Sequence, residues 1–168
     1  GLGAFAYAWL RDGTPIAGAT GATHTLAQAD VGAEIAVEVS YTDGAGTEES
    51  VASAATAPVD NVNDAPTGTV LVTGTAAQGA TLTADASSLV DADGLGALAY
   101  AWLRDGTPIP GATGATRTLT QADVGAEIAV EVSWTDGGGT EESVASAATA
   151  PVGNVNDAPT GAVLVTGT

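Results

Sequence analysis

The chain has 168 residues, and its 20 Asp and Glu residues against 3 Lys and Arg residues give a formal net charge of −17. A surface this acidic repels a phosphate backbone, so we expect no nucleic acid partner. With no cysteine and one histidine, the sequence assembles neither a disulfide framework nor a thiolate or histidine zinc site.

The sequence repeats with a period of 93 residues. Trp9 aligns with Trp102, for example, and only eight of the 75 aligned positions differ. Such a period predicts a tandem array. We expect one complete copy at 61–153, the C-terminal part of a preceding copy at 1–60, and the linker and first strand of a following copy at 154–168. Because the chain does not begin with Met, we expect it to be a fragment whose ends carry no readable targeting signal.

Short segments in which apolar and polar residues alternate predict β-strands along the complete copy. They lie, in chain order, at 69–73, 80–84, 98–104, 117–120, 127–134 and 142–152. Turns rich in Asp, Gly and Pro separate them, as at Asp105–Pro108. Seven or so short strands in about 90 residues predict an all-β fold, an antiparallel immunoglobulin-like sandwich, with only the later strands present in the first copy.

Longer strings resemble a known family. YAWLRDGTPIPGAT at 100–113 and NVNDAPTG at 61–68 and 154–161 look like the Ig-like tandem repeats of very long bacterial RTX-type surface adhesins. The resemblance implies a stalk or spacer module, located outside the cell or on the bacterial surface after type I secretion. Its partners would be neighbouring repeats, with cell-surface or glycan ligands bound by other domains in adhesion and biofilm formation, and with no membrane insertion.

The segments Asp60–Pro66 and Gly153–Pro159, which we call the seams, also resemble the cadherin linker DxNDNxP. The oxygen atoms of that linker hold calcium between successive domains. Asn63, Asp64 and Pro66 match the motif, whereas its second Asn is missing and Asp60 is displaced by one residue. The resemblance therefore implies one or two calcium ions at a joint rather than three.

Acidic loops favour the same chemistry, because Ca²⁺ takes six to eight oxygen ligands, mostly carboxylates and carbonyls. In an Ig topology the loop at 91–94 and the loop that begins at Asp136 lie at the end of the domain that faces the incoming seam. We therefore expect calcium in a structural role. The candidate ligands, strongest first, are Asp91, Asp93, Asp64, Asn63, Asp136, Asp30 and Asp60.

Other interpretations remain open. Asp-rich loops also form for purely conformational reasons, and Asp30 and Asp123 could simply cap the loop before the next strand. Glu141 and Glu142 could serve only to keep a strand edge from pairing with neighbours.

The alternative function is a glycan- or protein-binding Ig-like module that uses its loops or a sheet face. Trp134 would then lie partly exposed and could stack on a sugar. We expect no enzymatic activity, because acidic residues that recur in each repeat are better explained by a role at each joint.

Overall fold

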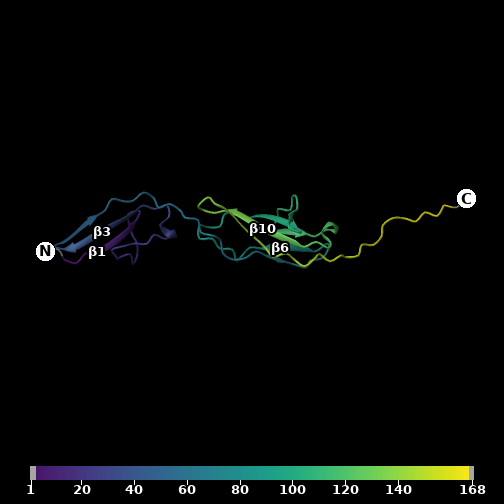
Figure 1. Ribbon diagram of the computed structural model, residues 1–168, viewed down its shortest axis with the longest axis horizontal. Helices are drawn as coiled ribbons and strands as arrows, with labels where there is room; N and C mark the ends of the chain where they lie inside the picture. The colour runs from purple at the N-terminus through teal and green to yellow at the C-terminus, as the bar shows by residue number, and fades with distance from the viewer. Residues whose placement is uncertain (1–2, 167–168) are drawn as a thin grey trace. The chain divides into compact units, whose positions relative to one another are not determined.

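The computed structural model describes residues 3–166, and the chain divides into two compact units, Gly1–Asn63 and Asp64–Thr168 (Figure 1). The described residues form three antiparallel sheets and two short 3-10 helices, with no α-helix. The prediction of an all-β chain with antiparallel strands is confirmed. No helix within residues 3–166 is long and apolar enough to cross a membrane.

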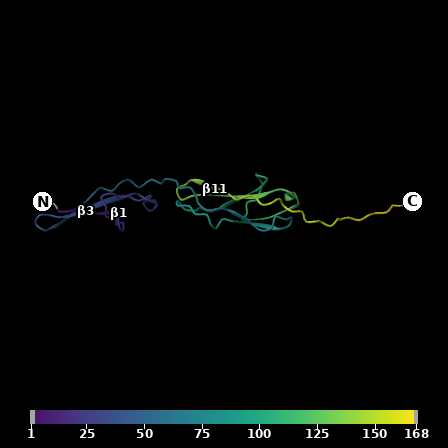
Figure 2. The ribbon, with the colours of Figure 1, turned by 60° about the horizontal axis from the view of Figure 1, so that its bottom comes forward.

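The first unit contains one four-stranded sheet of order β2-β1-β3-β4. Its strands are β1 (Ala6–Arg11), β2 (Thr14–Pro15), β3 (Ile35–Thr42) and β4 (Glu48–Ala52). Figures 1 and 2 show β1 and β3 side by side, as their antiparallel pairing requires. The two-residue turn Asp12–Gly13 joins β1 to β2, and both of its residues have positive φ. Asp and Gly tolerate that conformation, which explains why this dipeptide closes the hairpin.

The second unit repeats this sheet with the order β11-β10-β7-β8. Its strands are β7 (Ala99–Arg104), β8 (Thr107–Pro108), β10 (Ile128–Thr135) and β11 (Glu141–Ala145). The register is the same as in the first unit, because Ala99 opposes Ser133 where Ala6 opposes Ser40. The repeated sequence thus forms the same sheet twice.

A three-stranded sheet of order β5-β6-β9 exists only in the second unit. Its strands are β5 (Leu71–Thr73), β6 (Thr81–Asp85) and β9 (Thr116–Thr118). Residues 23–25, the first-repeat counterpart of β9, form no strand. The reason is that β9 pairs with β6, and the first unit has no counterpart of β6 in this chain.

Apolar side chains from both sheets of the second unit form one core. Leu82 from β6 and Trp102 from β7 are each fully buried in it. The other buried members are Val70, Ala84, Leu89, Leu119, Ile128, Val130, Val132, Trp134 and Val152. The alternating burial of β10 follows from its alternating sequence, since successive strand side chains point to opposite faces.

The predicted strand at 142–152 is too long, because β11 ends at Ala145. Beyond it, the hydroxyl oxygens of Ser146 and Thr149 accept hydrogen bonds from the backbone amides of Val130 and Ile128. The backbone of this stretch still donates to β10, from Ser146 N to Val130 O at 2.9 Å. Side-chain oxygens therefore replace backbone carbonyls along this edge, and the regular ladder stops.

Candidate metal centre

Two acidic loops of the second unit meet at the same end of the sheets. One follows β6 and contains Asp91 and Asp93, and the other joins β10 to β11 and begins at Asp136. The amide of Gly137 donates to the carbonyl of Asp93 at 3.0 Å. A Cβ atom at position 137 would collide with that carbonyl oxygen, so only glycine allows the two loops to approach this closely.

Three carboxylates converge at this end. Asp91, Asp136 and Glu142 each place one carboxylate oxygen within 4.8 Å of the others. Asp91 is 9% exposed and Asp136 6% exposed, while Glu142 is half-buried. Three negative charges at this separation repel one another by ~3 kcal/mol for each pair in an intermediate dielectric.

Asp136 has one satisfied and one unsatisfied oxygen. Its Oδ1 accepts a hydrogen bond from the amide of Thr140 at 2.7 Å. Its Oδ2 is buried with no hydrogen-bond partner. A buried carboxylate oxygen left in this state is costly, and a bound cation would satisfy it.

No basic side chain is available to neutralise this cluster. The sequence has three arginines and no lysine. Arg104 and Arg117 both bind Asp123, and Arg11 binds Asp30. All three arginines thus pair with an aspartate outside the cluster of three carboxylates.

Trp134 closes one side of the cluster. Its indole Nε1 donates to Asp91 Oδ2 at 3.2 Å, and the side chain is 3% exposed. The expectation of a partly exposed Trp134 is therefore wrong. The residue faces the core because it lies in the inward phase of β10, together with Val130 and Val132. A buried indole has no free face on which a sugar could stack.

Asp93 binds the incoming seam. Its Oδ2 accepts the backbone amide of Asp64 at 2.7 Å, while its own amide donates to Asp91 Oδ1 at 2.8 Å. Asp93 thus lies one hydrogen bond from the three-carboxylate cluster without joining it. Asp64 contributes its amide to this contact, and its side chain is exposed, as are those of Asn63 and Asp60.

Asp30 belongs to the first unit and has several partners of its own. Its carboxylate, fully buried at the end of the 3-10 helix Gln28–Asp30, accepts from Arg11 Nε at 2.8 Å and from the amide of Ala27 at 2.9 Å. His24 Nε2 lies 3.1 Å from Oδ2, the oxygen that also accepts from Ala27. The hydrogen bonds from Ala27 and then Arg11 hold the pKa of Asp30 below its ordinary value. These contacts support the capping interpretation for this residue.

Asp123 has the equivalent place in the second unit, at the end of the 3-10 helix Gln121–Asp123. Arg117 replaces His24 there and donates to both carboxylate oxygens, at 2.9 and 3.1 Å. Burial opposes the ionisation of Asp123, but hydrogen bonds from the amide of Thr120 and from Arg104 and Arg117 outweigh it and lower its pKa far below the ordinary value.

Glu142 is not among the ligands predicted from the sequence, since its position there indicated an acid on a strand edge. The pairing of β10 with β11 indicates its role. Glu142 pairs with Trp134 across β10 and β11, and the alternation of β11 turns it inward while Glu141 stays exposed. The inward phase of β11 therefore places the Glu142 carboxylate beside those of Asp91 and Asp136.

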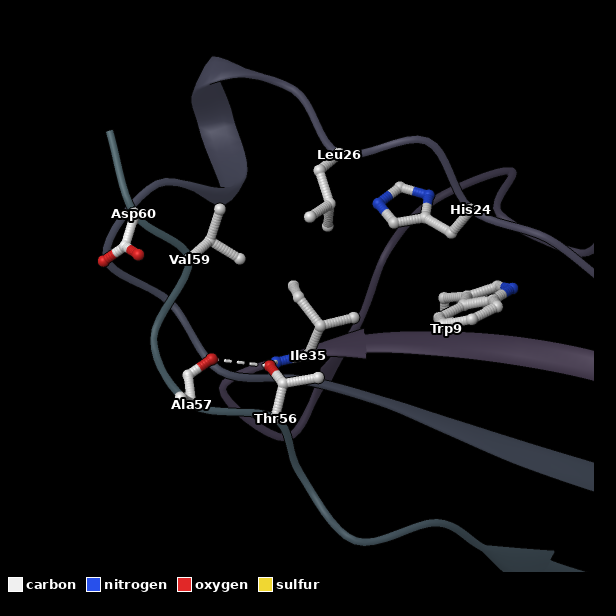
Figure 3. A pocket seen from close by; sticks show the side chains of 8 residues that line it. All are labelled: Trp9, His24, Leu26, Ile35, Thr56, Ala57, Val59 and Asp60. Atoms are coloured by element: carbon white, nitrogen blue, oxygen red, sulfur yellow. Dashed lines mark hydrogen bonds between the residues drawn. The ribbon is translucent and has the colours of Figure 1, made fainter. Parts of the chain in front are cut away.

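The first unit contains an apolar hollow in place of a second sheet. It is lined by Trp9, His24, Leu26, Ile35, Thr56, Ala57, Val59 and Asp60 (Figure 3). The rings of Trp9 and His24 lie 5.6 Å apart and tilted by 33°. In the second unit the counterparts of Trp9 and Leu26, which are Trp102 and Leu119, are buried in the core.

Comparison with known proteins gives no functional assignment, because no family model matches the chain and no curated protein matches it.

Proposed function

We propose that the chain is part of a run of Ig-like β-sandwich repeats that serve as a spacer in a long bacterial adhesin outside the cell. In this proposal Ca²⁺ binds at Asp91, Asp136 and Glu142 and stiffens the end of the repeat that receives the seam. The module holds other domains at a distance and carries out no reaction.

The near-identity of the repeats supports a spacer. A spacer repeat needs only to fold and to join its neighbour, so successive copies can keep one sequence. A repeat that recognised a ligand would instead present exposed aromatic side chains, and Trp102 and Trp134 are both buried.

The observation that carries the metal proposal is the buried, unsatisfied Oδ2 of Asp136 within a group of three carboxylates. The donors are all oxygen atoms, which suits a hard cation and excludes a soft one. Three carboxylates leave room for waters and backbone carbonyls in a coordination sphere of six to eight. Ca²⁺ accepts such an irregular sphere, whereas Mg²⁺ requires a near-ideal octahedron.

The experiment is a thermal melt of the full chain in EDTA, in millimolar Ca²⁺ and in millimolar Mg²⁺. Tryptophan fluorescence in a Trp9→Phe background reports the second unit, because the two remaining tryptophans, Trp102 and Trp134, lie in its core. At a Ca²⁺ concentration one hundred times the Kd, we expect the melting temperature of this unit to rise by about 10 °C or more.

Asp136→Asn should abolish the rise, because it removes one charge from the cluster. Asp43→Asn is the matched control, since Asp43 is the first-repeat counterpart of Asp136 and has no counterpart of Asp91 beside it. Equal melts in EDTA and Ca²⁺, or an equal loss in both variants, would contradict the proposal and leave a spacer whose acidic loops serve only turn formation.

A further inference from the structure

The seam that leaves the second unit is held by the side chain of Gln78, in the turn between β5 and β6. Its Nε2 donates to Asp157 Oδ2 at 2.9 Å, and its Oε1 accepts the backbone amide of Val155 at 3.3 Å. Both ends of one carboxamide are therefore used on the same short segment. No metal ion is required for either contact.

The backbone around Gln78 is fixed to the start of the same seam. Gln78 N donates to the carbonyl of Gly153 at 2.9 Å, and Gly153 N donates to the carbonyl of Ala76 at 2.8 Å. Ala77 and Gly153 form a parallel bridge. The glutamine side chain thus starts from an anchored and half-buried position, which reduces the conformational entropy lost when it binds the seam.

The two seams use the same aspartate position in different ways. Asp157 is the counterpart of Asp64, and it offers its carboxylate to Gln78. Asp64 offers its backbone amide to Asp93 at 2.7 Å. Because the two contacts use different groups of one residue, a single seam aspartate can satisfy both.

We propose that Gln78 is a positioning residue that fixes the course of the outgoing seam through an amide–carboxylate pair with Asp157. The ligand of this site is the protein's own seam, recognised by a carboxylate at position 157 and a backbone amide two residues earlier. The start of the next repeat is thereby directed by the repeat before it, independently of any ion at Asp91, Asp136 and Glu142.

The test compares amide hydrogen exchange at Val155 and the ¹⁵N heteronuclear NOE of residues 154–158 in the full 168-residue chain, in EDTA. In Gln78→Ala we expect exchange at Val155 to accelerate about three- to tenfold, the effect of one net hydrogen bond, and the NOE values to fall. Gln121→Ala is the control, because Gln121 is an exposed glutamine on η2 of the same unit. Unchanged protection of β10 amides shows that each variant is folded.

Exchanging the amide and the carboxylate between positions 78 and 157 makes the test specific to this pair. Gln78→Glu keeps the acceptor for Val155 but places a carboxylate against that of Asp157, so it should loosen the seam at pH 7. Adding Asp157→Asn returns an amide donor to the pair and should restore protection at Val155. The proposal is overturned if exchange and NOE values in Gln78→Ala match those of the wild type, or if the reversed pair loosens the seam as much as Gln78→Glu alone.

Discussion

The two units share a sheet and differ in what covers it. β1 and β3 pair in the same register as β7 and β10, and their sequences are nearly identical. Trp102 is nevertheless fully buried, whereas its counterpart Trp9 is half-buried. The strands and their pairing thus arise from local sequence, and burial requires the second sheet.

Leu26 and Leu119 make the same point for a single residue type. Leu119 is 1% exposed in the core of the second unit, and Leu26 is 52% exposed at the edge of the first unit's hollow (Figure 3). Full burial of a leucine contributes about 1.5–3 kcal/mol. The identical residue therefore stabilises one unit far more than the other.

The acidic loops differ in a parallel manner. In the first unit, Tyr41 donates its hydroxyl to Glu49 at 2.9 Å, and this hydrogen bond raises the pKa of Tyr41. In the second unit Trp134 stands in place of Tyr41 and turns its donor to Asp91. The first unit therefore has a donor for its glutamate, while the second unit gathers three carboxylates.

The largest expected difference between the units is in their stability to opening. Amide hydrogen exchange should show β3 at least about a thousandfold less protected than β10, because several apolar side chains of the first unit lack cover and each is worth about 1.5 kcal/mol or more. Equal protection of the two strands would show that the second sheet adds no stability.

The next effect comes from the two equivalent tryptophans. Trp102→Ala should destabilise the second unit by about 3–4 kcal/mol, because it opens a cavity in a closed core. Trp9→Ala should cost the first unit much less, since Trp9 is only half-buried. Amide hydrogen exchange at low urea concentrations, followed at β10 for the second unit and at β3 for the first, gives both values. Similar losses would contradict the difference in burial.

A smaller effect follows from the buried carboxylate of Asp123. Its folded-state pKa is lowered, so its contribution to stability is complete above the unfolded-state pKa of about 4 and is lost as the pH falls below that value. Asp123→Asn should cost about 2–3 kcal/mol at pH 7, less than the usual cost of breaking a fully buried pair, because Arg104 is partly exposed.

The pH dependence separates this charge effect from a loss of packing. Denaturation of the wild type should show stability falling between pH 5 and pH 2, and Asp123→Asn should show a smaller fall. Glu127→Gln, a change at an exposed carboxylate next to β10, is the control and should resemble the wild type. If the stability of Asp123→Asn fell with pH as steeply as that of the wild type, the acid dependence would come from other groups.

The smallest expected effect comes from replacing one residue of the second repeat by its counterpart in the first. Arg117→His makes the second unit resemble the first at this position, where His24 contacts Asp30. We expect a loss of about 1 kcal/mol at pH 8 and less at pH 5, because a histidine that gains a carboxylate partner stabilises the fold only while it is protonated. Denaturation at both pH values measures the difference, and an equal loss at both would show that the charge at position 117 has no role.

The sequence was sufficient to predict the strands whose partners lie nearby. The alternation of Ile128 to Trp134 predicted β10, and turn chemistry predicted the chain reversal at Asp105–Gly106. Thr107 and Pro108 were predicted as part of that turn, whereas they pair with β7 as the short strand β8. The end of β11 could not be predicted, since it depends on the hydroxyl groups of Ser146 and Thr149.

The acidic site was only partly predictable for a related reason. Residue type and loop position pointed to Asp91 and Asp136, because oxygen ligands in loops are visible in a sequence. The inclusion of Glu142 depends on the pairing of β10 with β11, and the contact of Asp93 with the amide of Asp64 depends on tertiary packing. Neither can be obtained from residue spacing alone.

The most direct test of this account is a Ca²⁺ titration followed by ¹H–¹⁵N correlation spectra of the full chain. We predict saturable shifts of the Trp134 indole N–H and of the Asp93 amide, with the amides of residues 43–49 in the first unit unmoved. Shifts of equal size in both acidic loops, or none in either, would contradict the assignment of a cation site to the second unit.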